Sequence, residues 1–137
     1  ADPGANLVDL AHRHDVDVIP FVGPSSLMMA LMSSGMNGQS FAFNGYLPVK
    51  PHERKAKIKE LEKRSRNGRQ SQIFIETPYR NDAMLADILE VCEASTRVCI
   101  AADITLPSAY IKTRRVQDWK QNRVTIGKRP CVFILMA

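Results

Sequence analysis

Short apolar runs alternate along the chain with longer segments whose apolar residues recur at helical spacing. Runs rich in branched and aromatic side chains, which are typical of strands, occur at residues 16–21, 41–43, 73–75, 98–102 and 131–136, with an extended piece near 109–112. The run at 131–136 is wholly apolar, which predicts a strand covered on both faces. The Asn44-Gly45 pair predicts a turn after the second strand.

Two helices are predicted before the second strand. One follows Asp2, which can cap it with Pro3 in the first turn. The other covers residues 27–34, with Ser25 as its cap and Gly35 as its stop. Apolar residues occupy most faces of this second helix, so we expect it to be buried, with its methionines as core filler rather than as ligands.

Three further helices are predicted later in the chain. Residues 51–66 form a basic helix whose few apolar positions provide only a narrow contact seam, so most of its surface faces water or a ligand. The next helix begins at Asn81 or Asp82, either of which can cap it. A short last helix includes Trp119. The alternation of strands and helices predicts an α/β or α+β fold.

The strand at residues 73–75 ends abruptly in polar and turn-forming residues. Pro78 disfavours helical geometry at Thr77 and fixes its own φ, so the chain must turn there. Glu76 and Arg80 are thereby gathered at the carboxyl end of a strand, where ligands bind in open α/β sheets. A structural interpretation is equally open, in which Glu76 and Arg80 pair with each other and hold the turn.

The composition is that of one globular domain, with 137 residues of which 45% are hydrophobic. The three cysteines lie far apart within apolar runs, which predicts reduced core residues of a cytosolic protein. Neither the cysteines nor the three histidines have the spacing of a metal site, and no metal is predicted. Residues 19–48 carry no charge, but prolines and glycines interrupt them, so a membrane span is rejected. No secretory signal is predicted.

Positive charge is concentrated in two segments. The chain has a net charge of +5, yet residues 50–69 contain nine Lys and Arg against three Glu, and residues 112–129 contain seven against Asp118 alone. Clustered basic charge on an otherwise acidic domain predicts a polyanionic partner. The alternative is a solvated helix face with no partner.

No complete catalytic motif is visible in the sequence. It contains no Ser-His-Asp set, no P-loop and no paired histidine motif. The amides of the turn at Gly23-Pro24-Ser25-Ser26 precede a helix, so they could hold a carboxylate or the polar edge of a cofactor. The residues alone therefore indicate an α/β domain with a polar crevice and two basic flanks.

Four motifs follow one another along the chain: Asp2-Pro3-Gly4, Gly23-Pro24-Ser25-Ser26, Phe43-Asn44-Gly45-Tyr46-Leu47-Pro48-Val49-Lys50 and Phe74-Ile75-Glu76-Thr77-Pro78-Tyr79-Arg80. This series resembles the tetrapyrrole methylase superfamily. Within it, the resemblance is closest to the branch that methylates a ribose 2′-hydroxyl of small-subunit ribosomal RNA. The likeness covers nearly the whole chain.

The resemblance implies two α/β domains, a mixed sheet flanked by helices in the second domain, a homodimer, and S-adenosylmethionine bound between the domains. Residues 1–23 would be the remnant of the amino-terminal cofactor-binding domain, and residues 24–137 the carboxyl-terminal methylase domain. The chain would then be a fragment with half a cofactor pocket. A cytoplasmic location and a role in rRNA processing follow from the same resemblance.

Site residues are carried over from the superfamily by position. Cofactor contacts are expected from Asp2, Pro3, Gly4, Ser25, Ser26, Glu76, Asp103 and Ile104. After Asp103 the chain reads Ile104-Thr105-Leu106-Pro107, where the RNA-methylating branch usually has a stretch like Glu-Leu-Thr-Lys. This departure bears on which RNA nucleotide is the target.

Catalytic and RNA-contacting residues are predicted from their places in the chain. Glu76 or Arg80 is expected to orient the acceptor hydroxyl, because both follow a strand end. The basic helix is expected to contact RNA through Lys50, Arg54, Lys55, Lys57 and Arg64.

Two other functions are compatible with the sequence. One is methylation of a porphyrin or corrin ring, whose carboxylates would also suit basic residues. The other is a non-catalytic RNA-binding or dimerisation domain. The Lys- and Arg-rich helix after Leu47-Pro48 favours RNA over a ring substrate.

Overall fold

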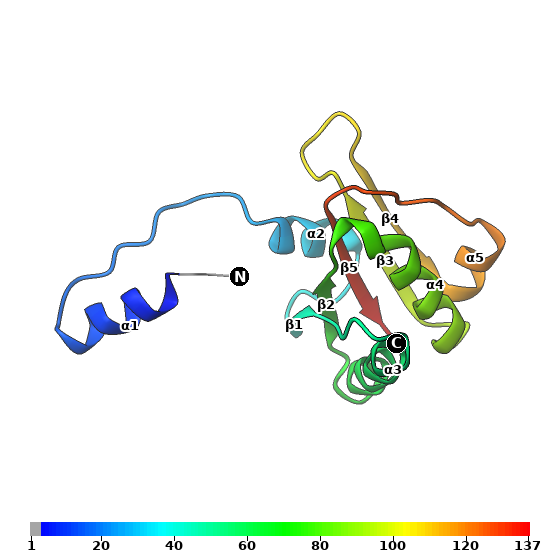
Figure 1. Ribbon diagram of the computed structural model, residues 1–137, viewed down its shortest axis with the longest axis horizontal. Helices are drawn as coiled ribbons and strands as arrows, with labels where there is room; N and C mark the ends of the chain where they lie inside the picture. The colour runs from blue at the N-terminus through cyan, green and yellow to red at the C-terminus, as the bar shows by residue number, and fades with distance from the viewer. Residues whose placement is uncertain (1–3) are drawn as a thin grey trace.

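The computed structural model describes residues 4–137, and its centre is a mixed β-sheet with the strand order β1-β2-β5-β3-β4 (Figure 1). The strands are β1 (Phe41–Tyr46), β2 (Ser71–Ile75), β3 (Arg97–Ala102), β4 (Tyr110–Arg115) and β5 (Cys131–Met136). β1 and β2 are parallel, whereas β5 is antiparallel to both β2 and β3. β2 and β3 therefore run in the same direction on either side of β5, and β4 lies antiparallel at the edge.

Helices cover the two faces of this sheet unequally (Figure 1). One face carries α3 (Pro51–Gly68), α4 (Asn81–Val91) and α5 (Val116–Gln121), which bury Ile58, Ile88 and Trp119 against the sheet. The opposite face carries only α2 (Ser26–Ser34) among the described elements. The predicted α/β fold, a mixed sheet flanked by helices, is confirmed.

β5 is buried from both sides, as its wholly apolar sequence predicts. Phe133 and Leu135 belong to the cluster beneath α3, α4 and α5, whereas Val132 and Ile134 belong to the cluster beneath α2. The rings of Phe133 and Phe74 stack with their centroids 5.7 Å apart, which links β5 to β2 within the core.

The start of α4 is held differently from the prediction. No side chain caps this helix, which follows the short 3-10 turn η1 (Pro78–Arg80). The Asn81 side chain instead donates to the carbonyls of Gly127 and Arg129, at 2.9 and 2.7 Å. The Asp82 carboxylate accepts from the Gly127 amide at 3.1 Å. The two residues predicted as caps thus fasten the loop that leads into β5, because that loop packs across the start of the helix.

The predicted strand at residues 16–21 is wrong. These residues form an irregular, exposed segment, and the Phe21 side chain is 94% exposed. Figure 1 shows this segment and α1 (Ala5–Arg13) extending away from the sheet. A strand needs a neighbour to accept its backbone hydrogen bonds, and no described strand lies beside this segment. The predicted helix cap Asp2 lies outside the described residues.

Two smaller expectations also fail. β1 continues through Asn44-Gly45 instead of turning there, because Gly45 adopts φ +63° and the strand shifts register between Phe43 and Tyr46. α2 begins after its predicted cap Ser25 and stops at Gly35, but it is not buried on all sides. Met32 is 78% exposed, because α2 covers the sheet with one face only.

No helix among residues 4–137 has both the length and the apolar character needed to span a membrane.

Candidate functional site

A groove of about 340 Å³ opens at the edge of the sheet where β2 and β3 end. Four of the predicted cofactor-contacting residues line it: Ser26, Glu76, Asp103 and Ile104. The remaining lining residues are Tyr46, Ile75, Pro78, Ala101, Leu106, Pro130, Cys131 and Val132. Residues far apart in the sequence therefore meet at a single site.

The sheet topology explains why they meet. β2 and β3 are parallel, so Glu76 and Asp103 emerge at the same edge. β5 lies between them and begins at that edge because it runs the opposite way. The Asp103 amide donates to the carbonyl of Pro130 at 3.0 Å, which ties the end of β3 to the residue before β5.

The Glu76 carboxylate is buried and only partly satisfied. Its Oε1 accepts from the Thr77 amide at 2.6 Å and from Arg80 Nη2 at 2.8 Å. Its Oε2 is also buried but has no hydrogen-bond partner among the described residues. The structural interpretation, an ion pair that holds the turn, is therefore correct for one oxygen, while the other remains an unused acceptor in a residue that lines the groove.

The charge state of Glu76 follows from these contacts. Burial alone would raise the pKa of its carboxyl, but the hydrogen bonds from Arg80 and Thr77 outweigh burial and hold the pKa below its ordinary value. Glu76 is therefore an anion at neutral pH. An anionic oxygen without a partner can accept a hydrogen bond from a hydroxyl or ammonium group of a ligand.

Asp103 is held in an unusual backbone conformation. Its φ is +52°, in the left-handed region that disfavours residues with a Cβ. Its carboxylate accepts from the Ser108 hydroxyl at 3.0 Å, and Arg129 Nη1 lies 3.8 Å away. The Leu106 amide donates to the Asp103 carbonyl at 2.9 Å, which closes the turn after β3. These contacts fix the position of Asp103 at the groove.

Several predicted site residues do not line the groove. Ser25 caps α2, where its hydroxyl accepts from the Met28 amide at 3.5 Å. Asp2 and Pro3 lie outside the described residues. Gly4 is not among the residues that line the groove. It directly precedes α1, a helix that Figure 1 shows away from the sheet. The exposed segment after α1 provides no packing that would hold Gly4 near the other residues.

Sequence reasoning missed other groove residues. Tyr46 ends β1 at the same edge, and Pro130 precedes β5 there. The available signal was the strand boundary, which is the end of β1 for Tyr46 and the start of β5 for Pro130. It could be used only once the order and direction of the strands were known, because neighbouring strand ends meet only when they share an edge.

No family model matches this chain, but individual curated proteins are similar to it in sequence. The ribosomal RNA small subunit methyltransferase I of Vibrio cholerae is 38% identical over 105 residues, which span 77% of this chain and 35% of the relative. The protein of the same name from Thermotoga maritima is 38% identical over 107 residues, spanning 77% and 45%.

Solved structures share the fold. The cobalt precorrin-4 methyltransferase CbiF matches with a TM-score of 0.60 at 14% identity, over 98% of this chain and 58% of that one. The methyltransferase CobJ matches with a TM-score of 0.58 at 18% identity, over 96% and 57%. Sequence and fold thus point to the same group. Both findings support the predicted resemblance to the tetrapyrrole methylase superfamily.

This chain spans between about a third and a half of the length of the curated relatives that it matches. Among its described residues, no group of three or more His, Cys, Asp or Glu side chains is placed to hold a metal. Its three cysteines are free and buried, and burial raises the pKa of Cys92 and Cys131 to about 12.

The basic helix, α3, does not present all of its predicted RNA contacts. Arg54 is only 4% exposed, and its Nε donates to Asp87 Oδ2 at 2.6 Å while its Nη1 donates to the Val49 carbonyl at 3.0 Å. The structure therefore contradicts an RNA-contacting role for Arg54, because α4 packs over it. The other four predicted cations, Lys50, Lys55, Lys57 and Arg64, each lie in an ion pair.

Proposed function

We propose that the complete protein transfers a methyl group from S-adenosylmethionine to a ribose 2′-hydroxyl of small-subunit ribosomal RNA. The observation that carries the proposal is the convergence of Ser26, Glu76 and Asp103 on one groove. The names of the relatives support the RNA substrate, since they are called ribosomal RNA small subunit methyltransferases.

We also propose that residues 1–23 belong to a cofactor-binding domain and that residues 24–137 are the second domain. Two observations support this division. First, residues 16–23 are exposed and form no strand. Second, the volume of the groove, about 340 Å³, is near the lower limit of the roughly 300–1,000 Å³ that is typical of ligand pockets. A second wall supplied by another domain would enlarge and close it.

The groove residues fit the proposed methyl donor. Glu76 offers an anionic, unpartnered oxygen, and Asp103 offers a second buried carboxylate held by Ser108. Carboxylates bind the hydroxyl and ammonium groups that this donor carries. When bound, S-adenosylmethionine supplies an electrophilic methyl group on a sulfonium. Contacts from Asp2, Pro3, Gly4 and Ser25 remain predictions.

The chain's contribution to the reaction would be positioning. Methyl transfer requires in-line approach of the acceptor oxygen, so much of the rate comes from orientation. We propose that Glu76 or Arg80 orients the acceptor. Arg80 already holds Glu76 through its Nη2, while its buried Nε has no partner among the described residues. A ribose hydroxyl is a weak nucleophile, and a desolvating pocket or a base would be needed to assist it.

The test is methyl transfer by the complete protein. Radiolabelled S-adenosylmethionine and unmethylated small-subunit rRNA are supplied, and the label on the RNA is measured. We expect Glu76→Gln and Arg80→Ala to lower kcat/KM by about 100-fold. Ser95→Ala, an exposed change just before β3 and outside the groove lining, is the control and should leave transfer unchanged. Wild-type rates in both site variants would reject the roles of Glu76 and Arg80, and no transfer by the wild type would reject the RNA methylase function.

One alternative is supported by a specific observation. The fold likeness to CbiF and CobJ is compatible with methylation of a corrin or porphyrin ring. Supplying such a ring instead of RNA in the same assay distinguishes the two, because label should enter only one substrate. A non-catalytic role for this chain is tested by calorimetry with S-adenosylmethionine, since tight binding by residues 1–137 alone would contradict a half-built pocket.

A homodimer and a cytoplasmic location are further proposals. Apolar side chains remain exposed on the side of the sheet that carries α2, including Met32, Phe41 and Phe43. A second copy or another domain would cover them. Light scattering of the complete protein measures the oligomeric state directly. The free cysteines and the rRNA substrate support a reducing, cytoplasmic setting.

A further inference from the structure

The two basic segments look alike in sequence but differ in their surroundings. On α3 and its flanks, seven of the nine Lys and Arg have a carboxylate within 4.0 Å. Some of these acids belong to α3 itself, such as Glu60, which pairs with Lys57 and Arg64. Others come from α4 and the residues after it, such as Glu90, which pairs with Lys55 at 2.7 Å. The charge of α3 is therefore largely neutralised by its neighbours.

The second segment is neutralised much less. Within residues 4–137, Arg129 is the one member of its seven Lys and Arg that lies within 4.0 Å of a carboxylate, that of Asp103 at 3.8 Å. Lys112 and Arg114 lie on β4, Lys120 lies on α5, and Arg123 follows α5; we name these four residues the β4–α5 basic surface. Within residues 4–137, no carboxylate lies within 4.0 Å of any of them. Asp118 is the one acid in this stretch of sequence.

Local contacts hold the β4–α5 basic surface together. The Arg114 guanidinium lies 5.0 Å from the centroid of the Trp119 ring, and its Nη1 donates to the Asn122 carbonyl at 3.4 Å. Trp119 is itself fixed in the core, where its Nε1 donates to the Val98 carbonyl at 2.9 Å. The cation on β4 is therefore anchored beside the residue that precedes Arg123.

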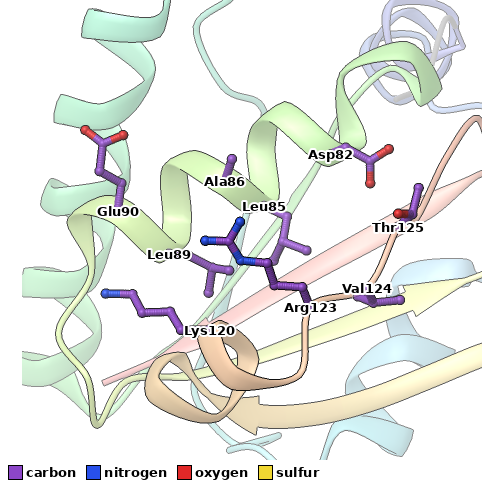
Figure 2. A pocket seen from close by; sticks show the side chains of 9 residues that line it. All are labelled: Asp82, Leu85, Ala86, Leu89, Glu90, Lys120, Arg123, Val124 and Thr125. Atoms are coloured by element: carbon purple, nitrogen blue, oxygen red, sulfur yellow. The ribbon is translucent and has the colours of Figure 1, made fainter.

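A groove of about 810 Å³ adjoins this surface (Figure 2). Leu85 and Leu89 of α4 supply apolar side chains to it, and Lys120 and Arg123 line it from the α5 side. Figure 2 shows the Arg123 side chain reaching from its loop toward α4.

The two acids that line this groove are already engaged. Asp82 accepts from the Ile126 amide at 2.7 Å, and Glu90 accepts from Lys55 Nζ at 2.7 Å. Lys120 and Arg123, by contrast, have no carboxylate within 4.0 Å in the described chain. A ligand entering here meets uncompensated positive charge beside an apolar wall.

We propose that the β4–α5 basic surface, rather than α3, carries the phosphate contacts to single-stranded RNA. A cation already paired with a carboxylate must exchange that partner for a phosphate, which leaves little net gain, whereas an unpaired cation releases only counterions from the RNA. The adjoining groove accommodates an unstacked base, because its leucines provide apolar surface and the planar guanidinium of Arg123 can stack on a base. The inference rests on the proposed RNA substrate and adds where that RNA lies.

The experiment compares two charge-matched double variants of the chain. Lys120→Gln with Arg123→Gln removes two charges from the β4–α5 basic surface, and Lys57→Gln with Arg64→Gln removes two from α3. Fluorescence anisotropy measures binding of a labelled single-stranded RNA oligonucleotide over a salt series from about 50 to about 200 mM. Circular dichroism melting of each variant verifies that both remain folded.

The expected results differ sharply. With a slope of about −0.7 per phosphate contact on a single strand, losing two contacts should reduce the salt slope by about 1.4 and the affinity at physiological salt by about tenfold. The α3 variant should bind within about twofold of the wild type, because its removed charges were already paired. A larger loss in the α3 variant than in the β4–α5 variant would overturn the proposal, as would equal binding of an RNA duplex by the wild type.

Failure here is separable from failure of the proposed function. If the β4–α5 variant binds RNA as tightly as the wild type while the complete protein still methylates rRNA, the RNA surface is misplaced but the function stands. If the complete protein methylates no rRNA while the variants behave as expected, the methylase function is wrong and the RNA-binding surface remains.

Discussion

Removal of one partner from the buried ion pair between α3 and α4 should be among the most destabilising single changes in this domain. Arg54 contacts Asp87 through Nε at 2.6 Å and Nη2 at 2.5 Å, with side chains only 4% and 11% exposed. Arg54→Ala leaves the Asp87 carboxylate buried with only Lys55 nearby, at 3.7 Å. Removing one partner of a buried pair costs about 3–5 kcal/mol.

Such a loss is a large fraction of the roughly 5–15 kcal/mol that holds a typical domain folded. We expect the midpoint of thermal unfolding to fall by about 9–20 °C, using about 3–4 °C per kcal/mol for a domain of this size. Urea unfolding followed by far-UV circular dichroism gives the free energy of unfolding directly. The double variant Arg54→Met with Asp87→Leu should recover most of the loss, because it removes both charges together.

Lys57→Ala is the matched control for this prediction. It breaks the ion pair with Glu60 on the outer surface of the same helix, where both side chains are hydrated, so the free energy of unfolding should stay close to that of the wild type. If Arg54→Ala destabilises the chain no more than Lys57→Ala does, the assignment of Arg54 as a structural residue is refuted. Its predicted RNA contact would then deserve renewed testing.

Three further predictions concern acid sensitivity, thiol reactivity and backbone conformation. Burial tends to raise the pKa of the Glu62 carboxyl, but hydrogen bonds from Thr96 and the Glu93 amide lower it below its ordinary value of 4.5. The ionised Glu62 carboxylate therefore stabilises the fold above pH 4.5, and this stabilisation is lost as the pH falls through the lowered pKa of the folded state. Glu62→Gln should make the free energy of unfolding decline less steeply as the pH is lowered. A decline as steep as that of the wild type would contradict this prediction. The thiols, buried and with the pKa raised to about 12 for Cys92 and Cys131, should resist a thiol reagent until urea unfolds the chain, and rapid labelling of the native chain would show that they are accessible. Gly45→Ala should cost about 1 kcal/mol in urea unfolding, because φ is +63° and nothing lies within 4 Å of the added Cβ; no change would indicate that β1 relaxes.

Local pattern was sufficient for most elements of the fold. The wholly apolar run at residues 131–136 predicted β5, and the cap Ser25 with the stop Gly35 predicted α2. These predictions succeeded because they depend on neighbours within one or two turns or on burial of a short strand. The strand predicted at residues 16–21 failed because apolar composition does not supply the hydrogen-bonding neighbour that a strand requires.

Four members of the candidate groove were predictable from the sequence, but its boundaries were not. Glu76 and Asp103 each follow an apolar run, which is a local signal for a strand end. That they share a groove with Pro130 depends on β5 lying between β2 and β3, an arrangement set by pairing of residues far apart in the chain.

The sequence by itself determined how much positive charge each basic segment carries, since charge is a property of the residues. Only the tertiary structure decided which of those charges remain available. Packing of α4 against α3 brings Asp87 and Glu90 beside cations more than thirty positions away, whereas no acid is folded onto Lys120 and Arg123 in the described chain. An electrostatic field depends on where opposite charges lie in space, and their order along the chain does not contain that information.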